Sequence, residues 1–322
     1  MEDKVLLDVQ GLKTYFHTFK GVVKAVDNVS FSLKEGEILG IVGESGSGKS
    51  VTSFSILKLV EDPGVVDADH IMFDGKDLAK ISERDMSKIR GKDISMVFQD
   101  PMTSLNPVMP VGDQILEVIR NHHPELSKQD AKKQAGDMLE MVGIPAGRYN
   151  DFPHQFSGGM KQRVIIAIAL ACNPQLLIAD EPTTALDVTI QAQVLEMIRN
   201  LKQKNNTSML LITHDLGVVA QNCDSVAIIY AGEIVEYGTL SQVYENTLHP
   251  YTEGLFGSIP NLETNSRRLA AIDGMMPDPT MLPKGCKFAD RCKYAEERCH
   301  VENPQLMELE DGHKVRCFRC MK

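Results

Sequence analysis

The sequence predicts an α/β fold with a β-rich N-terminal subdomain, an inserted helical subdomain and a small cysteine-rich C-terminal extension. Three observations predict it. Apolar strands come directly before a glycine-rich loop and before an acidic pair. A stretch with helical periodicity interrupts that pattern. Five of the seven cysteines lie between Cys286 and Cys320. In α/β folds ligands bind at the carboxyl ends of the strands, so the functional residues are expected there.

Composition narrows the class of protein. The chain has 322 residues and a formal net charge of −10, which argues against broad nucleic-acid binding. Its longest apolar run covers residues 164–172, far short of the roughly 20 residues that span a bilayer. The first residues lack the charged-then-apolar pattern of a signal peptide. We therefore expect a soluble, cytoplasmic chain whose work at a membrane, if any, is done through a partner.

The elements follow in order along the chain. Short apolar stretches with turn signals predict strands over residues 6–41, and the last of these strands covers 38–42. A helix is expected over 51–60. Helical periodicity then appears over 111–120 and 128–142, which predicts the inserted helical subdomain at about 101–156.

The core resumes after the helical subdomain. We expect a strand over 176–179, a helix over 190–202 and a strand over 209–213. Proline and glycine become frequent from about residue 250. We place the boundary near Pro260, with a nucleotide-binding domain over 1–260 and the cysteine-rich extension over 261–322.

The first motif with clear chemistry is the P-loop at residues 43–50, Gly-Glu-Ser-Gly-Ser-Gly-Lys-Ser. Its backbone N–H groups can cradle phosphates, Lys49 would reach the β- and γ-phosphates, and the Ser50 hydroxyl would ligate Mg²⁺. The residues expected to contact ATP here are Gly43, Ser45, Gly46, Gly48, Lys49, Ser50 and Val51.

A second anion site follows in residues 156–163. Ser157 is placed as a helix N-cap, with Gly158 and Gly159 beside it, so that free N–H groups and the helix dipole face an anion. Lys161 and Arg163 further along this helix fit exposed helix charges at least as well as a phosphate role. Two anion sites cannot easily serve one nucleotide, so we expect a second subunit to complete the ATP site.

An acidic pair ends the predicted strand over 176–179. Asp180 would act on Mg²⁺, and Glu181 would orient or deprotonate the attacking water. The alternative, a solvated acidic turn, fits poorly with two adjacent carboxylates that emerge from an apolar strand.

With these motifs in this order, the chain resembles the ATP-binding-cassette (ABC) ATPases. The resemblance implies that Gln99 is the glutamine that senses Mg²⁺ and water, that Asp187 meets the partner subunit near ATP, and that His214 is a catalytic histidine near the γ-phosphate. It also implies an aromatic ring that stacks on adenine, for which Tyr15 is our choice and Phe16 a close competitor.

The chain departs from the family pattern at its second anion site. Phe156 stands where leucine is common, and Met160 stands where glutamine is common. The serine and the two glycines that face phosphate are intact, so we expect a working contact.

A closer resemblance covers nearly the whole chain. Residues 43–52, 98–107, 179–189 and 249–252 are similar to the ATPase subunits of bacterial dipeptide/oligopeptide importers. Membership implies ATP-driven dimer closure, a partner ATPase in a homo- or heterodimer, two membrane permeases, an extracytoplasmic peptide-binding protein and a place on the inner face of the membrane. Alternatives are a nickel or other small-solute importer, or a cassette ATPase that acts on DNA or ribosomes.

The cysteine tail has the spacing C-x5-C-x6-C-x17-C-x2-C. Four thiolates suit a [4Fe–4S] cluster, and thiolates also suit Zn²⁺ or can stay unmetallated. The importer family has a similar tail, and some of its members resemble iron–sulfur proteins there. We favour Cys286, Cys292, Cys299 and Cys317 as ligands, with Cys320 as a substitute for Cys317, and a structural role over a redox one.

Overall fold

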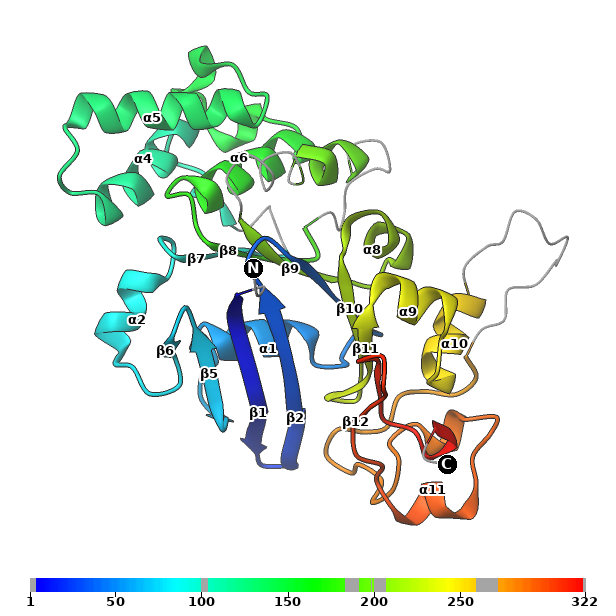
Figure 1. Cartoon of the computed structure of the whole chain (residues 1–322). Coiled ribbons are helices and arrows are strands. Elements are labelled where there is room, and N and C mark those ends of the chain that lie inside the picture. Colours follow the sequence, from blue (N-terminus) through cyan, green and yellow to red (C-terminus); the bar gives the residue numbers. More distant parts are fainter. Residues whose placement is uncertain are drawn as a thin grey trace, which may run out of the picture. The chain divides into compact units, whose positions relative to one another are not determined.

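The computed structural model describes residues 4–99, 104–182, 191–197, 199, 207–258 and 272–320. The chain divides into two compact units (Figure 1). The helical unit comprises Met1–Leu6, Leu33–Ile38 and Lys80–Ile212, and the P-loop unit comprises Leu7–Ser32, Leu39–Ala79 and Thr213–Lys322.

Three parallel strands form the sheet of the helical unit. They are β7 (Ile94–Val97), β8 (Leu176–Asp180) and β9 (Ser208–Thr213), with β8 in the middle. All residues of β8 and β9 are buried, as expected for parallel strands covered on both faces. The strand expected over 176–179 and the strand expected over 209–213 are thus confirmed.

Three helices of this unit pack against one another. In Figure 1, α4 and α5 lie side by side with α6 next to them, and all three pairs are in contact. Ser127 caps α5 and accepts a hydrogen bond from the Asp130 N–H at 3.1 Å. The predicted helices over 111–120 and 128–142 are therefore confirmed, with ends shifted by at most two residues. The bounds are α2 (Glu83–Ile89), α4 (Val111–His122), α5 (Lys128–Met141), η1 (Ala146–Arg148), η2 (Pro153–Gln155) and α6 (Gly158–Leu170).

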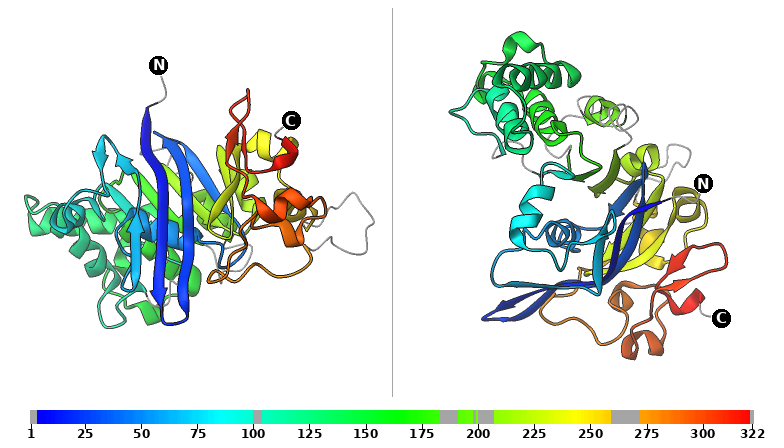
Figure 2. Two further views of the ribbon diagram at one scale, coloured as in Figure 1. Left: turned by 90° about the horizontal axis from the view of Figure 1, so that it is seen from below. Right: turned by 60° about the vertical axis from the view of Figure 1, so that its left-hand side comes forward.

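The P-loop unit contains an antiparallel sheet with the order β2-β1-β5-β6, and β4 also pairs with β1. The register of β1 against β5 sets Leu7 opposite Phe73, and both side chains are buried. The long strands β1 and β2 and the shorter β5 run side by side in Figure 2. The bounds are β1 (Val5–Thr18), β2 (Gly21–Lys34), β4 (Gly64–Asp67), β5 (His70–Phe73) and β6 (Lys76–Asp77).

A second set of strands in the P-loop unit joins the P-loop strand to the tail. Strand β3 (Ile38–Val42) pairs in parallel with β10 (Ser225–Tyr230), which pairs with β11 (Glu233–Thr239). From there β13 (Lys314–Val315) and β12 (Met307–Glu308) continue the antiparallel order. The tail is thus built onto the strands that carry the P-loop.

The remaining helices of the P-loop unit are short. Helix α1 begins at Lys49 and ends at Ile56, earlier than the end expected near residue 60. Lys58 just beyond it has a φ of 51°, a left-handed conformation that ends helices. The bounds of the others are α8 (Leu216–Asn222), α9 (Leu240–Glu245), α10 (Pro250–Gly257), η3 (Ala289–Arg291), α11 (Glu297–Val301) and η4 (Phe318–Cys320).

Two further expectations concern the helix after β8 and possible membrane spans. Of the helix expected over 190–202, residues 191–197 and 199 are helical, and the others lie outside the described residues. Within the part of the chain that is described, no helix has both the length and the apolar character that a membrane crossing needs.

Candidate functional site

The P-loop folds tightly against its own unit because its glycines leave no room for side chains. A Cβ on Gly43 would lie 2.2 Å from the Ile229 carbonyl oxygen. Gly48 has a φ of 105°, and a Cβ there would lie 2.3 Å from the Ala25 carbonyl oxygen. The loop therefore takes a shape that only glycine allows at these two positions.

Lys49 is the first residue of α1 and is 5 % exposed. Its Nζ donates to the carbonyl oxygens of Gly43 at 2.8 Å and Glu44 at 3.0 Å. The ammonium is thus held over the loop, next to the helix N-terminus, where an anion is favoured. Ser45 and Gly46 are exposed at the tip of the loop, and Ser50 and Val51 follow Lys49 in the first turn of the helix.

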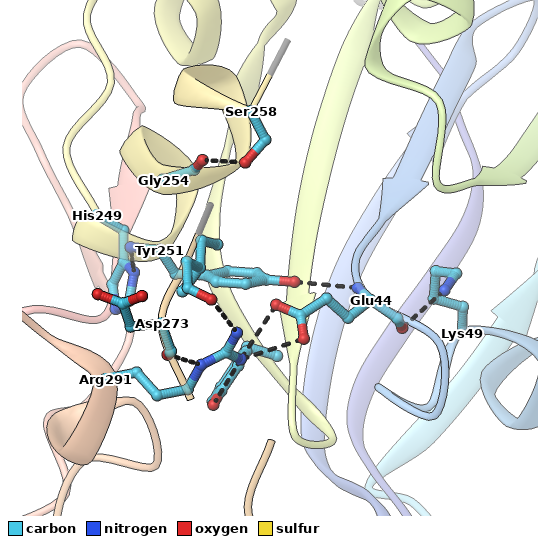
Figure 3. Close-up of polar contacts among 10 residues, drawn as sticks. Glu44, Lys49, His249, Tyr251, Gly254, Ser258, Asp273 and Arg291 are labelled. Atoms are coloured by element: carbon cyan, nitrogen blue, oxygen red, sulfur yellow. Dashed lines mark hydrogen bonds and ion pairs between the residues drawn. The ribbon is translucent and has the colours of Figure 1, made fainter. Parts of the chain in front are cut away.

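Glu44, whose side chain the sequence left without a role, is bound from the C-terminal part of the chain. Its N–H donates to the Tyr251 hydroxyl at 3.0 Å, and its two carboxylate oxygens accept from Arg291 Nη1 at 3.1 Å each (Figure 3). Tyr251 is buried against the rings of Tyr230 and Phe288. A signal existed for Tyr251, since residues 249–252 carry the importer resemblance, but its partner could not be inferred.

Tyr15 and Phe16 are both half-buried but differ in surroundings. The Tyr15 hydroxyl donates to Asp27, and Lys24 Nζ lies 5.3 Å from the centre of its ring. Burial, together with the Asp27 carboxylate, raises the pKa of Tyr15 above its usual range. The Phe16 ring packs at the start of β4, 2.8 Å from where a Cβ on Gly64 would lie. That Tyr15, and not Phe16, stacks on adenine stays a prediction.

The acidic pair lies at the carboxyl end of β8, as the sequence predicts. Asp180 ends the strand and is 1 % exposed. Glu181 follows with a φ of 46°, unusual for a residue with a side chain and frequent at functional sites. Its N–H donates to the Ile212 carbonyl at 2.8 Å, which fixes this turn to the end of β9.

Gln99 is brought to Glu181 by the sheet. Strands β7 and β8 run parallel with Val97 opposite Ala179, so the residues two positions further on meet at the same edge. Gln99 Nε2 donates to Glu181 Oε2 at 2.8 Å. Two residues that are 82 positions apart in the sequence thus form one polar pair.

The signature loop, residues 156–159, is presented outward. Ser157 is the N-cap of α6, as predicted, and its hydroxyl accepts from the Met160 N–H at 3.4 Å. Ser157 and Gly158 are exposed, Gly159 is half-buried, and a Cβ on Gly158 would meet nothing within 4 Å. Phe156, which replaces the usual leucine, is buried under the Arg148 guanidinium at 4.1 Å.

Arg163, one of the two cations near the start of α6, has hydrogen-bond partners within the helical unit. Arg163 donates to the Val142 carbonyl and to Gln193 Oε1, both at 3.1 Å, which is a structural role inside the helical unit. Arg163 is thus half-buried and bound within its own unit, whereas the sequence offered an exposed helix charge or a phosphate contact.

His214 directly follows β9 and is exposed. The next residue, Asp215, is the N-cap of α8 and accepts from the Gly217 N–H at 2.8 Å. The histidine thus lies in the turn between a strand and a capped helix. Asp187 lies outside the described residues.

The predicted residues fall in both units. Gln99, Asp180, Glu181 and the signature loop belong to the helical unit, whereas Tyr15, the P-loop, His214 and the cysteine tail belong to the P-loop unit. Within the units the structure brings together Gln99 with Glu181, and the P-loop with residues of the tail.

Four tail cysteines line one cavity in the P-loop unit: Cys286, Cys292, Cys299 and Cys317. The cavity has a volume of about 20 Å³. Its other lining residues include His249, Phe288 and Tyr294. All seven cysteines of the chain are free thiols. Cys320, the substitute ligand in our prediction, is not among the lining residues. Among the described residues, no three His, Cys, Asp or Glu side chains are grouped so that they could hold a metal ion.

The thiols influence one another. Burial, together with the three other thiols of the cavity, raises the pKa of Cys286 to about 11. Burial likewise raises the pKa of Cys292 and of Cys317. Without a cation between them, Cys286, Cys292 and Cys317 are therefore held as neutral thiols near pH 7.

Comparison with known proteins places these features in a family. The family model described as "ABC transporter" matches residues 26–184, and the model "Oligopeptide/dipeptide transporter, C-terminal region" matches residues 235–299. The chain is 54 % identical to the oligopeptide transport ATP-binding protein OppD of Bacillus subtilis strain 168, covering 97 % of this chain and 88 % of that protein. It is 47 % identical to the dipeptide transport ATP-binding protein DppD of Escherichia coli strain K12, covering 97 % and 96 %.

Solved structures agree. A dimeric ATP-binding cassette in a post-hydrolysis state with ADP and Pi matches with a TM-score of 0.66 and 27 % identity, covering 73 % of this chain and 99 % of that one. The P-loop, the acidic pair and the capped signature helix are the parts expected of such a cassette. The chain therefore belongs to the ABC transporter family, among the oligopeptide and dipeptide transport ATP-binding proteins.

Proposed function

We propose that this chain is the ATP-hydrolysing subunit of a peptide importer. Its relatives at about half identity act in oligopeptide and dipeptide transport, and the peptide-transporter C-terminal region is matched as well. These matches favour peptides over nickel or another small solute. The single observation that carries the enzymatic part is the Gln99–Glu181 hydrogen bond of 2.8 Å at the carboxyl end of β8.

In this proposal the residues have separate roles. Lys49 and the N–H groups of the P-loop hold the phosphates of ATP, with Tyr15 at the adenine. Glu181 orients or deprotonates the attacking water, with Gln99 holding its carboxylate and His214 acting at the γ-phosphate. The oxygen donors of Ser50, Asp180 and Gln99 fit Mg²⁺, which supplies charge neutralisation to the phosphates when it is bound.

A second ATPase subunit completes each site. The signature loop, with Ser157 at the start of α6, faces outward and offers N–H groups to an anion on another molecule. Asp187 belongs to the same contact in this proposal. Binding of ATP to both sites closes the dimer, and hydrolysis opens it. A homodimer and a heterodimer both fit these features.

The transport partners are two membrane permeases and, indirectly, an extracytoplasmic peptide-binding protein. The support is the family, whose named relatives are transport ATP-binding proteins. The chain then works at the cytoplasmic face of the membrane. Co-purification of the chain with its permeases from solubilised membranes tests this part, and recovery of the chain without any membrane protein would contradict it.

A [4Fe–4S] cluster on Cys286, Cys292, Cys299 and Cys317 completes the proposal. The donor set fits, because four thiols face one cavity and thiolates are what such a cluster requires. Thiolates suit Zn²⁺ as well, so the preference for a cluster rests on the tail's resemblance to the importer family, some of whose members resemble iron–sulfur proteins there. Iron, sulfide and zinc measured after anaerobic purification decide among cluster, zinc and free thiols.

The test of the ATPase mechanism is Glu181→Gln. It removes the charge that acts on water but keeps the oxygen that accepts from Gln99. We expect ATP turnover to fall at least a hundredfold and the protein to elute as a dimer with ATP. Glu140→Gln, at an exposed position of α5, is the control. Undiminished turnover in Glu181→Gln would refute the assignment.

A further inference from the structure

Two cations of the cysteine-bearing segment reach the nucleotide-binding half of the P-loop unit. Arg291 directly precedes Cys292, and Lys287 directly follows Cys286. Arg291 binds Glu44 of the P-loop, 247 residues away in the sequence. Lys287 binds Asp27, 260 residues away, which in turn holds the Tyr15 hydroxyl. The stretch 286–292 thus contacts the phosphate loop directly and, through Asp27, is linked to the hydroxyl of Tyr15, the ring assigned to adenine.

The Arg291–Glu44 pair differs from an ordinary surface ion pair. The Arg291 side chain is 7 % exposed, and its Nε donates to the Asp273 carbonyl at 2.9 Å. Its guanidinium also faces the Tyr230 hydroxyl at 3.3 Å. Figure 3 shows the group pointing at the Glu44 carboxylate from the tail side. A charge fixed in this way loses little conformational entropy when it acts.

Glu44 is a poor neighbour for ATP unless its charge is neutralised. It lies inside the phosphate-binding loop, and its own carbonyl accepts from Lys49 Nζ at 3.0 Å. A free carboxylate at this place repels polyphosphate, and the repulsion is strong where water is partly excluded. Arg291 cancels that charge, and the contact of its Nη1 with both carboxylate oxygens also restrains the backbone that carries the Glu44 N–H and carbonyl groups.

Lys287 acts at the other end of the site. Its side chain is 5 % exposed, and its Nζ lies 2.9 Å from Asp27 Oδ2, 3.1 Å from the Ala231 carbonyl and 3.4 Å from Glu233. Burial alone would raise the pKa of Asp27, but hydrogen bonds from Tyr15 and Lys287 outweigh it and lower the pKa below its usual value. Asp27 therefore stays ionised and keeps the Tyr15 hydroxyl in place.

We propose that Arg291 is a positioning residue of the nucleotide site, through which the cysteine-bearing segment sets the affinity of the P-loop for ATP. Lys287 supports the same site through Asp27 and Tyr15. The proposal rests on the proposed binding of ATP by this loop. Because coupling between sites is reciprocal, bound ATP stabilises the 286–292 segment to the same extent.

The experiment compares Kd for a fluorescent ATP analogue in the full chain, purified anaerobically with its metal content measured. Arg291→Met keeps the length of the side chain but leaves the Glu44 charge uncompensated, so Kd should rise at least tenfold at low salt. The increase should shrink as salt is raised, because it arises from charge. Adding Glu44→Gln to Arg291→Met removes the offending carboxylate and should bring Kd to within threefold of Glu44→Gln alone.

The rescue separates positioning from a general loss of structure, because a misfolded tail would not be repaired by a substitution in the P-loop. Lys293→Met, which breaks an exposed ion pair to Glu253 in the same tail, is the matched control. Failure of the wild-type chain to bind the analogue would refute the ATP site itself. Binding by wild type together with an unchanged Kd in Arg291→Met, or with no rescue by Glu44→Gln, would overturn this inference.

Discussion

The two anion-binding loops of this chain are built in opposite ways. The P-loop is packed from behind: Gly43 and Gly48 touch backbone carbonyls, Lys49 is buried, and Glu44 is held by Tyr251 and Arg291. The signature loop is open: Ser157 and Gly158 are exposed, and a Cβ on Gly158 would have free space around it. This difference fits the proposed roles of the two loops: the P-loop, which would bind the chain's own ATP, is shaped by its own chain, whereas the signature loop is left free for a second subunit to approach.

The largest effect should come from a glycine exchange in each loop. Gly48→Ala puts a Cβ 2.3 Å from a backbone carbonyl at a φ of 105°, which costs about 3 kcal/mol or more in native stability. We expect it to abolish ATP binding. Gly158→Ala should leave ATP binding intact in dilute protein, where no partner is present. It should lower turnover at least twentyfold, because in the proposed dimer the methyl group faces the partner's nucleotide.

Fluorescent-nucleotide titration and ATP turnover measure the two responses, and thermal unfolding reports on folding. Gly75→Ala, also at a positive φ but in open space, isolates backbone strain from collision. If Gly48→Ala bound ATP as wild type does, the P-loop would not be shaped as described. If Gly158→Ala turned ATP over at the wild-type rate, the open face of the signature loop would have no partner to meet.

Local features of both loops could be predicted from the sequence. The long-range contacts that hold the loops in place could not. The strand over 38–42 follows from a continuous apolar run, and the N-cap at Ser157 follows from one serine before a helix. These signals span a few residues. The sequence predicts too late an end for α1. The helix ends before Lys58, which has a left-handed φ, and a lysine gives no sign in the sequence of that conformation.

The supports of the P-loop depend on contacts across more than 200 residues. In the sequence, Arg291 and Lys287 look like their neighbours Lys293 and Arg298. The structure separates them: the side chains of the first two are 7 % and 5 % exposed, and those of the other two are 62 % and 54 % exposed. Which cation turns inward is decided by the packing of Phe288 and the tail strands, and no short pattern reports that.

The signature loop has its own support, and removing it should have the next largest effect. Arg148 stacks on Phe156, binds Asp151 at 2.7 Å and donates to the Gln155 carbonyl at 3.1 Å. These contacts hold the residue before Ser157 and together are worth about 1–2 kcal/mol. We expect Arg148→Met to lower turnover about tenfold while Kd for ATP stays unchanged.

The exposed Arg120→Met, on helix α4 of the same unit, is the matched control for loss of an arginine. A weaker binding of ATP by Arg148→Met would show that the helical unit contributes to the nucleotide affinity of the isolated chain. In that case the contrast between the two loops would be less sharp than the structure indicates.

The smallest effect tests the backing of the P-loop at a single hydrogen bond. Tyr251→Phe keeps the buried ring but removes the hydroxyl that accepts from the Glu44 N–H, so that a partly buried donor loses its partner. The cost is about 1 kcal/mol, so we expect a roughly fivefold rise in Kd for ATP.

Tyr237→Phe removes a comparable hydroxyl of the same unit, which donates to the Ser32 carbonyl at 3.0 Å. Both variants should lower the unfolding temperature by a few degrees, since each loses one hydrogen bond. Only Tyr251→Phe should weaken ATP binding. Equal Kd values in the two variants would mean that the Tyr251 hydroxyl stabilises the fold but does not affect the binding of ATP by the P-loop.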